Sequence, residues 1–166
     1  MITLVLGGAR SGKSVVAEAI ATEAAAGGAV TYVATITTSA ADQDLDARVA
    51  AHRARRPADW ATIEPPYDLC AVLRDTPGVV LVDSLGPWVA MQPEMQVDHA
   101  ALAAAVAARS DATVLVSDEV GWGVHPETEL GRRFRDAVGS LNQALATAAD
   151  ETLVVVAGRV LRTEAP

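Results

Sequence analysis

A stretch of eight residues near the amino terminus constrains the fold more than any other part of the chain. Its spacing fits G-x-x-x-x-G-K-[ST], the phosphate-binding P-loop, and its members are Gly7, Gly8, Ala9, Arg10, Ser11, Gly12, Lys13 and Ser14. The apolar segment 2–6 before it reads as a buried strand, and the Ala-rich segment 14–26 after it reads as a helix. A strand, a glycine-rich loop and a helix start together aim backbone N–H groups at an anion. The segment therefore predicts a nucleotide phosphate site.

Lys13 is the only lysine among the 13 Lys and Arg residues of the chain. An ammonium group is compact and has three rotating donors, so it fits a tight phosphate cradle that a flat guanidinium would not. We expect Lys13 to reach the β and γ phosphates and the Ser14 hydroxyl to ligate Mg²⁺. Gly7 and Gly12 supply the backbone freedom that such a loop needs.

Apolar strand-like runs alternate with helical segments along the whole chain. The expected strands are 2–6, 30–34, 79–82, 113–117 and 152–157; the expected helices are 14–26, 43–54, 98–109 and 128–148, with a short one at 67–74. This alternation predicts an α/β fold of the P-loop NTPase type (RecA-like), with a mostly parallel sheet and helices on both faces. The 166 residues fit a single domain. The Pro-bearing segments 57–66 and 86–97 are expected to be surface excursions.

Ligands of such sheets collect at the carboxyl ends of the strands. Two acidic positions there compete as the Mg²⁺ ligand: Asp83, and the pair Asp118 and Glu119. Either could instead be a solvated strand end or a helix cap. These patterns leave the ranking of the two positions open.

Composition narrows the partners and the compartment. A net charge of -8 and a pI near 4.7 argue against nucleic acid or an anionic membrane surface as the main partner. Cys70 is the only cysteine, which excludes an internal disulfide framework and fits a reducing compartment. No apolar run approaches the length of a membrane span, and the first one ends at Gly7, too short for a signal peptide. We therefore expect a cytoplasmic protein.

A basic segment follows the second expected strand. Arg48 and His52 are four residues apart and share a helix face, and Arg53, Arg55 and Arg56 follow before a proline. Cations are favourable near a helix C-terminus in any protein, so by itself the segment reads as a solvated basic helix end.

Several blocks, in order and over nearly the whole chain, resemble the bifunctional adenosylcobinamide kinase / adenosylcobinamide-phosphate guanylyltransferase family of cobalamin biosynthesis. They are the P-loop, Tyr32-Val33-Ala34-Thr35, Arg48-x-x-x-His52-x-x-x-Arg56-Pro57-x-x-Trp60-x-x-x-Glu64, Val82-Asp83-Ser84-Leu85 with Trp88, and the segments 118–127 and 131–150. A P-loop alone is common to many classes of protein, whereas these blocks together are specific to one family.

The resemblance implies two reactions. ATP or GTP phosphorylates adenosylcobinamide, and GTP then donates GMP to that phosphate through a guanylylated His52, with release of pyrophosphate. It also implies a homotrimer, catalytic roles for His52 and Lys13, and Mg²⁺ on Ser14 and Asp83. The nucleotide-binding residues that it implies are the eight of the P-loop together with Ala34, Thr35, Arg53, Ala54, Arg55, Arg56, Glu64 and Asp83. A neutral imidazole is a good nucleophile at pH 7, and neighbouring arginines can offset phosphate charge.

Three positions depart from the family pattern. Asp118 stands where the family usually has Asn, and Gly86 and Gln92 stand where it usually has Thr and Asn. Asp118 adds a negative charge near the expected phosphate site, so we favour Asp83 as the metal or nucleotide contact. Two alternatives stay open: an enzyme with guanylyltransferase activity alone, and a RecA-type nucleotide-hydrolysing module that uses Asp118 and Glu119.

Overall fold

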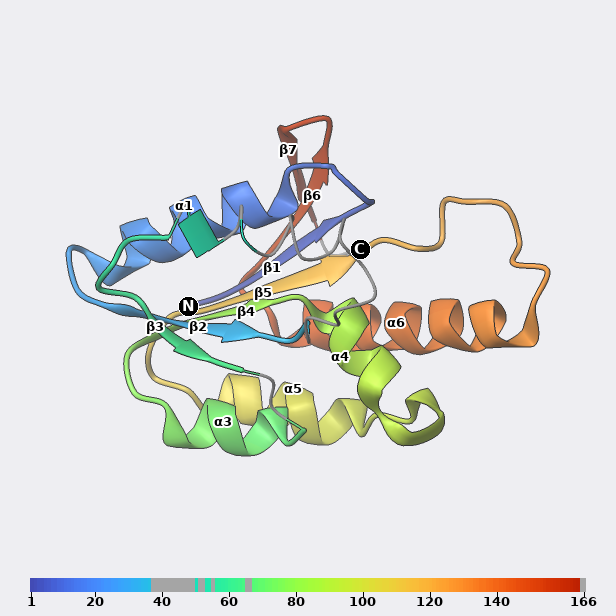
Figure 1. Ribbon diagram of the computed structural model, residues 1–166, viewed down its shortest axis with the longest axis horizontal. Coiled ribbons are helices and arrows are strands. Elements are labelled where there is room, and N and C mark those ends of the chain that lie inside the picture. Colours follow the sequence, from blue (N-terminus) through green and yellow to red (C-terminus); the bar gives the residue numbers. More distant parts are fainter. Residues whose placement is uncertain (37–49, 51–52, 55, 65–66, 165–166) are drawn as a thin grey trace.

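A seven-stranded sheet runs through the middle of the computed structural model, which describes residues 1–36, 50, 53–54, 56–64 and 67–164 (Figure 1). Within these residues the strand order is β3-β2-β4-β5-β1-β6-β7. The strands are β1 Ile2–Gly7, β2 Val30–Ala34, β3 Ala61–Ile63, β4 Val79–Asp83, β5 Thr113–Asp118, β6 Glu151–Val156 and β7 Arg159–Thr163. All five strands expected from the apolar runs are present, and the mostly parallel sheet confirms that prediction.

The strand order decides which strand ends meet the P-loop. Neighbouring strands are parallel from β3 to β6, and only β7 runs antiparallel, as the second strand of a hairpin with β6. β5 lies between β1 and β4, with Gly7 paired to Asp118 and Val116 paired to Asp83. The end of β5 is therefore beside the P-loop, and the end of β4 is one strand further away.

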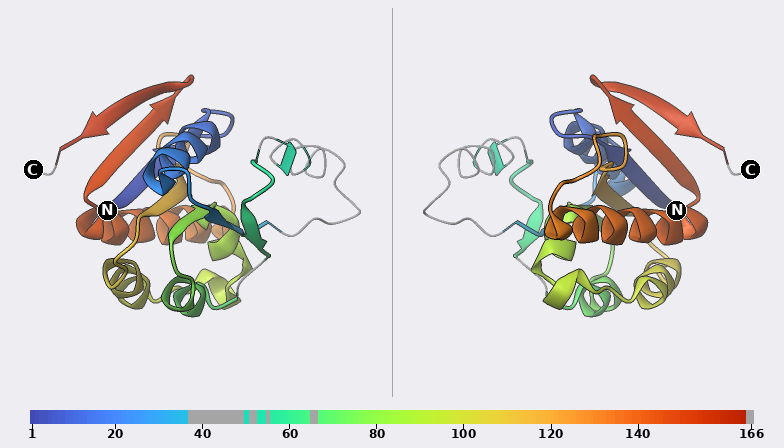
Figure 2. Two further views of the ribbon diagram at one scale, coloured as in Figure 1. Left: turned by 90° about the vertical axis from the view of Figure 1, so that its left-hand side faces the viewer. Right: turned by 90° about the vertical axis from the view of Figure 1, so that its right-hand side faces the viewer.

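Helices cover both faces of the sheet, as the alternating pattern predicted. α1 Lys13–Ala25 lies alone on one face among the described helices. The other face carries α3 Leu69–Asp75, α4 Leu85–Met91, α5 His99–Ala107 and α6 Glu129–Ala148, with the short 3₁₀ turn η1 Pro93–Met95 after α4. Figure 2 shows this three-layer arrangement from the side, with the β6–β7 hairpin at one end of the sheet. No described helix combines the length and the apolar character that crossing a membrane would require.

The sheet separates two apolar cores. Leu4 packs toward α3, α4, α5 and α6, whereas its neighbour Val5 packs toward α1. In β4, Val80 and Val82 face the first core and Leu81 faces the second. Successive side chains of a strand point to opposite faces, so a strand buried on both faces reads as an unbroken apolar run. This is why the central strands were readable from the sequence.

The prediction of a surface excursion over 86–97 is wrong for its first half. Residues 85–91 form α4, and Leu85, Trp88 and Val89 in it are buried. Pro87 lies in the first turn of the helix, where backbone N–H groups have no carbonyl partner within the helix. A proline, which lacks the N–H group, therefore costs the helix little stability at this position.

The two edge strands, β3 and β7, were not predicted from the sequence. β3 lies inside the predicted excursion 57–66, where it pairs with β2, and all five residues of β7 are exposed. Short or exposed edge strands lack the apolar run that identifies a central strand. The expected helix over 43–54 falls largely outside the described residues.

Arg109, just after α5, ties three segments together. Its guanidinium donates to the carbonyl oxygens of Leu73, Thr76 (2.6 Å) and Gly78 (2.6 Å), and its Nε donates to the Thr113 hydroxyl at 2.8 Å. These bonds fix the end of α3 and the turn into β4 against the start of β5. Burial lowers the pKa of the Arg109 guanidinium, although nearby Asp111 opposes that shift.

Candidate active site

The loop between β1 and α1 is held in place by close packing. Gly12 has a φ of 95°, which favours glycine, and it caps the N-terminus of α1. A Cβ on Gly7 would lie 2.5 Å from the Ser11 hydroxyl oxygen and 2.7 Å from the Val155 carbonyl oxygen. The Gly158 N–H donates to the Ser11 carbonyl at 2.8 Å, so the β6–β7 hairpin supports the loop. The lack of space thus requires glycine at position 7, and the backbone geometry favours it at position 12.

The Lys13 side chain folds back over this loop. Its Nζ lies 2.8 Å from Oδ1 of Asp118 and donates to the Gly8 carbonyl at 3.3 Å. Only 12% of the Lys13 side chain is exposed, against 26% of that of Asp118. The ammonium group is therefore positioned at the loop with a carboxylate as its counter-ion.

A pocket of about 570 Å³ opens beside the loop. Its size falls within the usual range for small-molecule sites. Ten of the predicted site residues line it: Ala9, Arg10, Ser11, Gly12, Lys13, Ser14, Ala34, Arg56, Glu64 and Asp83. Six lining residues were not predicted as nucleotide contacts: Val15, Tyr32, Ile36, Ser84, Pro87 and Asp118. The structure thus brings the P-loop, the ends of β2, β4 and β5, and the segment around β3 to one site.

Asp83 belongs to a buried polar cluster. The Tyr32 hydroxyl donates to Asp83 Oδ2 at 2.9 Å, and the Arg56 guanidinium lies 3.5 Å from the centre of the Tyr32 ring. Burial raises the pKa of Tyr32, and the Asp83 carboxylate raises it further, so the phenol stays protonated and donates. Arg56 also donates to the Thr62 hydroxyl at 3.2 Å. Tyr32 was not among the predicted site residues, although it is the first residue of the family block Tyr32-Val33-Ala34-Thr35.

Other predicted residues support the site without lining the pocket. Thr35 is fully buried; its hydroxyl accepts from the Ser84 N–H at 2.9 Å and donates to the Ser84 carbonyl, which clamps the end of β2 to the start of α4. Gly7 and Gly8 shape the loop. Arg53 forms an exposed ion pair with Glu64, while Ala54 is exposed and makes no contact with the pocket.

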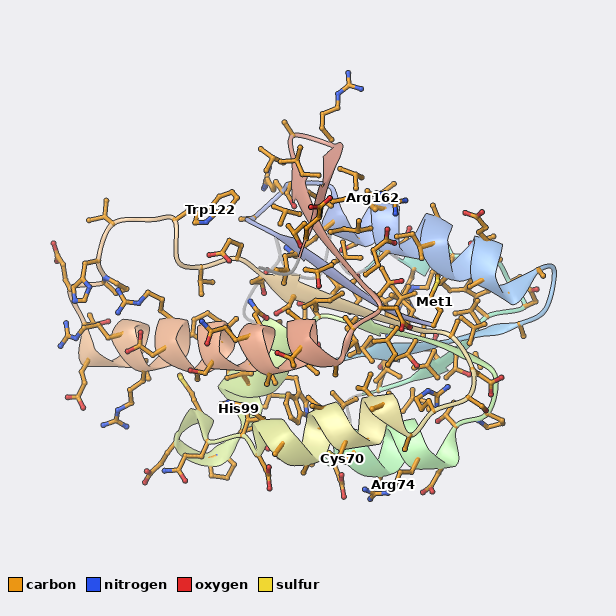
Figure 3. All side chains as sticks on the ribbon, turned by 180° about the vertical axis from the view of Figure 1, so that it is seen from behind. Met1, Cys70, Arg74, His99, Trp122 and Arg162 are labelled. Atoms are coloured by element: carbon orange, nitrogen blue, oxygen red, sulfur yellow. The ribbon has the colours of Figure 1, made fainter. Side chains whose placement is uncertain are left out.

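His52 and Arg55 lie outside the described residues, so their expected roles stay predictions. Cys70 and His99 are on α3 and α5, on the sheet face opposite α1, and do not line the pocket (Figure 3). Figure 3 also shows Trp122 on the long loop between β5 and α6, where its side chain is exposed.

The oxygen donors around the pocket fit a magnesium ion that is shared with phosphates. Mg²⁺ in nucleotide sites is usually held by one or two carboxylates or hydroxyls together with phosphate oxygens. The Ser14 hydroxyl and the Asp83 carboxylate both come from pocket-lining residues, as that arrangement requires. Asp118 also lines the pocket, where its carboxylate is paired with Lys13.

The residues at the end of β5 give little support to the alternative of a RecA-type nucleotide-hydrolysing module. Glu119, the expected partner of Asp118 in a RecA-type module, accepts a hydrogen bond from the Gly121 N–H at 2.6 Å. It does not line the pocket. The two departures on α4 are likewise outside the lining: Gly86 lies in its first turn, and Gln92, which ends it, donates to the Trp88 carbonyl at 3.3 Å.

Comparison with known proteins gives a family match over most of the chain. A family model described as cobinamide kinase / cobinamide phosphate guanyltransferase matches residues 3–163. The bifunctional adenosylcobalamin biosynthesis protein CobP of Pseudomonas aeruginosa is 41% identical over 95% of this chain and 94% of its own length. The bifunctional adenosylcobalamin biosynthesis proteins CobU of Salmonella typhimurium and Escherichia coli are 37% and 35% identical, each over 95% of this chain and 97% of their own.

Solved structures support the fold alone. A KaiC-like protein from Pyrococcus horikoshii superimposes with a TM-score of 0.54 at 15% identity, covering 92% of this chain and 71% of its own. The flagellar accessory protein FlaH of Methanocaldococcus jannaschii gives 0.51 at 17% identity, covering 96% and 74%. These likenesses agree with the P-loop NTPase-type fold expected from the sequence.

Proposed function

Because this chain belongs to the cobinamide kinase / cobinamide phosphate guanyltransferase family, we propose that both activities in that description use the pocket beside Lys13. The protein is an enzyme of cobalamin biosynthesis with a kinase and a guanylyltransferase activity. The observation that carries the proposal is that the P-loop, Asp83 and Arg56 line one pocket, although they come from distant parts of the chain.

GTP and ATP are the proposed nucleotides, and their phosphates lie along the P-loop. Backbone N–H groups at the start of α1 and the Lys13 ammonium bind the β and γ phosphates. Ser14 and Asp83 would hold Mg²⁺ together with phosphate oxygens. When bound, this ion supplies charge neutralisation and alignment of the phosphates.

In the kinase reaction, the aminopropanol hydroxyl of adenosylcobinamide attacks the γ-phosphorus. The bond from that phosphorus to the bridging oxygen breaks, the nucleoside diphosphate leaves, and the hydroxyl proton passes to solvent. Lys13, held near the loop in the nucleotide-free site, stabilises the negative charge that develops on the leaving diphosphate.

In the guanylyl reaction, an imidazole nitrogen of His52 attacks the α-phosphorus of GTP. The bond to the β-phosphate oxygen breaks, pyrophosphate leaves, and GMP stays on His52 as a phosphoramidate. An oxygen of adenosylcobinamide phosphate then attacks the same phosphorus, the P–N bond breaks, and the imidazole is regenerated. Arg56, in the pocket and four residues from His52, is available to the charge on the α-phosphate.

GTP labelled at the α-phosphate tests the covalent step. We expect label on the protein that survives base and is lost in acid, and that is absent in His52→Ala. His99→Ala, on the opposite face of the sheet from α1, is the matched control and should label normally. An α-label that never becomes covalent, or that persists in His52→Ala, would show the guanylyl assignment to be wrong.

A second assay separates the bifunctional enzyme from one with guanylyltransferase activity alone. Label should pass from the γ-phosphate of ATP or GTP to adenosylcobinamide. Transfer of GMP to adenosylcobinamide phosphate without this first transfer would restrict the chain to the second reaction.

We further propose that the enzyme is cytoplasmic, as its single cysteine led us to expect, and that it is a homotrimer, as the family resemblance implies. Light scattering on the purified protein should give three times the chain mass of 17.2 kDa. A monomer or a dimer across the micromolar range would contradict the trimer.

A further inference from the structure

The carboxylate of Asp118 is built into the phosphate site. The backbone at Asp118 is fixed on both sides, because the Glu119 N–H donates to the Gly7 carbonyl at 3.0 Å and the Asn142 side chain donates to the Asp118 carbonyl at 3.1 Å. β5 also pairs directly with β1 at this point. The side chain therefore starts from a rigid position beside the P-loop and reaches Lys13 Nζ at 2.8 Å.

Gly86 provides the space that this carboxylate occupies. A Cβ at position 86 would overlap Oδ2 of Asp118. One oxygen of the carboxylate is thus on Lys13, and the other lies over the first turn of α4. Any larger side chain at position 86 would force the carboxylate to move.

The ion pair and a bound nucleotide compete for the same ammonium group. Under the proposed function, Lys13 must contact the β and γ phosphates. Its ammonium group therefore either breaks its ion pair with Asp118 or contacts the carboxylate and the phosphates at the same time. Asp118 also lines the pocket, and its charge repels a phosphate that enters. Both effects weaken the binding of a nucleotide that arrives without a cation.

We propose that Asp118 is a positioning residue that holds Lys13 in the nucleotide-free site and releases it to a phosphate that arrives with a divalent cation. The inference rests on the proposed function. Transfer of Lys13 from Asp118 to the phosphates leaves a carboxylate without its counter-ion, and the cation restores the charge balance. Nucleotide affinity in this chain therefore depends on the cation more strongly than it would with a neutral side chain at position 118.

Asp118→Asn tests this dependence, because the amide nearly keeps the shape of the side chain and removes its charge. The dissociation constant for GTP is measured by titration calorimetry in EDTA and in excess Mg²⁺. We expect Asp118→Asn to bind GTP about tenfold more tightly than wild type in EDTA, and within about threefold of it in Mg²⁺. In steady-state assays without excess Mg²⁺, Asp118→Asn should lower the KM for GTP by a larger factor than the factor by which it changes kcat.

Glu119→Gln is the matched control. It removes the same charge one residue away, from a side chain that bonds to the Gly121 N–H and does not line the pocket. Its metal-free GTP affinity should stay within about twofold of wild type, because the lost charge is directed away from the phosphates. An equal gain in both variants would overturn the proposal in favour of a general charge effect.

Gly86→Ala is an independent test, because its added methyl group displaces the Asp118 carboxylate by steric overlap and leaves every charge in place. Displacing the Asp118 carboxylate from Lys13 should also tighten metal-free GTP binding, and Gly86→Ala should have no such effect in a protein that also carries Asp118→Ala. The proposal fails if Asp118→Asn binds metal-free GTP no more tightly than wild type while Lys13→Ala abolishes binding, a result that would leave the proposed function intact. Absence of GTP binding in wild type and Asp118→Asn alike would overturn both.

Discussion

Tyr32→Phe tests the polar cluster that anchors Asp83. The substitution removes one hydroxyl group and keeps the ring, so the packing of Tyr32, which is 3% exposed, is preserved, as is the Arg56 guanidinium over its face. What is lost is the hydrogen bond from the phenol to Asp83 Oδ2 at 2.9 Å, in a buried setting. The expected result is a less stable protein with a less firmly oriented carboxylate.

The size of the loss follows from the charge of the acceptor. A hydrogen bond to a charged group contributes about 1.5–3 kcal/mol to the free energy of unfolding. For a chain of 166 residues this corresponds to a fall in Tm of about 3–12 °C. Because Asp83 is the proposed Mg²⁺ contact, the concentration of Mg²⁺ that gives half-maximal activity should rise as well.

Urea unfolding of the nucleotide-free protein measures the stability term. Tyr67→Phe is the matched control, since the Tyr67 residue is 76% exposed and the same hydroxyl is removed. It should change the free energy of unfolding by less than about 0.5 kcal/mol. Equal and small effects of the two substitutions would refute the view that the Tyr32 hydroxyl stabilises Asp83.

The raised pKa of Tyr32 predicts a pH dependence with a definite sign. The folded phenol resists ionisation because it is buried beside Asp83, whereas the unfolded phenol ionises near about pH 10. The unfolded state therefore binds fewer protons above that pH, and the stability due to Tyr32 is complete below it and declines as the pH rises. The decline should be shallower in Tyr32→Phe than in Tyr67→Phe, and equal slopes would contradict the assignment.

Three further substitutions test other parts of the structure. Lys13→Arg should abolish measurable GTP binding in calorimetry, because a planar guanidinium does not fit the space of a lysine side chain that is only 12% exposed. Full guanylylation by this variant would be contrary evidence. Arg109→Ala should lower the free energy of unfolding by about 2–4 kcal/mol in urea titration, since it removes four hydrogen bonds from a charged donor. A loss below about 1 kcal/mol would contradict the view that Arg109 joins α3, β4 and β5. Gly7→Ala should cost about 1–3 kcal/mol through its clash with the Val155 carbonyl, whereas Gly8→Ala, where a Cβ meets nothing, should cost little; equal losses would show that the clash is relieved.

The central strands and the P-loop were predictable because their signals are local. A strand buried on both faces is an apolar run, and the loop requires glycine and lysine at fixed spacing. α4 was missed because Pro87 suggests a break when its position within a helix is unknown. β3 and β7 were missed because an edge strand needs no apolar run, and its pairing depends on a neighbour that is distant in the sequence.

The candidate site shows the same division between local and distant information. Lys13 could be identified from its motif, but its ion pair with Asp118 follows from β5 lying between β1 and β4. The contact of Tyr32 with Asp83 likewise joins residues 51 positions apart. Neither pairing leaves a trace in the spacing of residues along the chain.

The P-loop, the alternation of strands and helices, and the blocks of the family resemblance could all be predicted from residue types at short spacing. The tertiary structure decided which strand ends lie side by side. It therefore decided that Asp118 is next to Lys13, that Asp83 is bound to Tyr32, and that Gly86 leaves room for a carboxylate. Strand order is set by long-range packing, which local residue patterns do not encode.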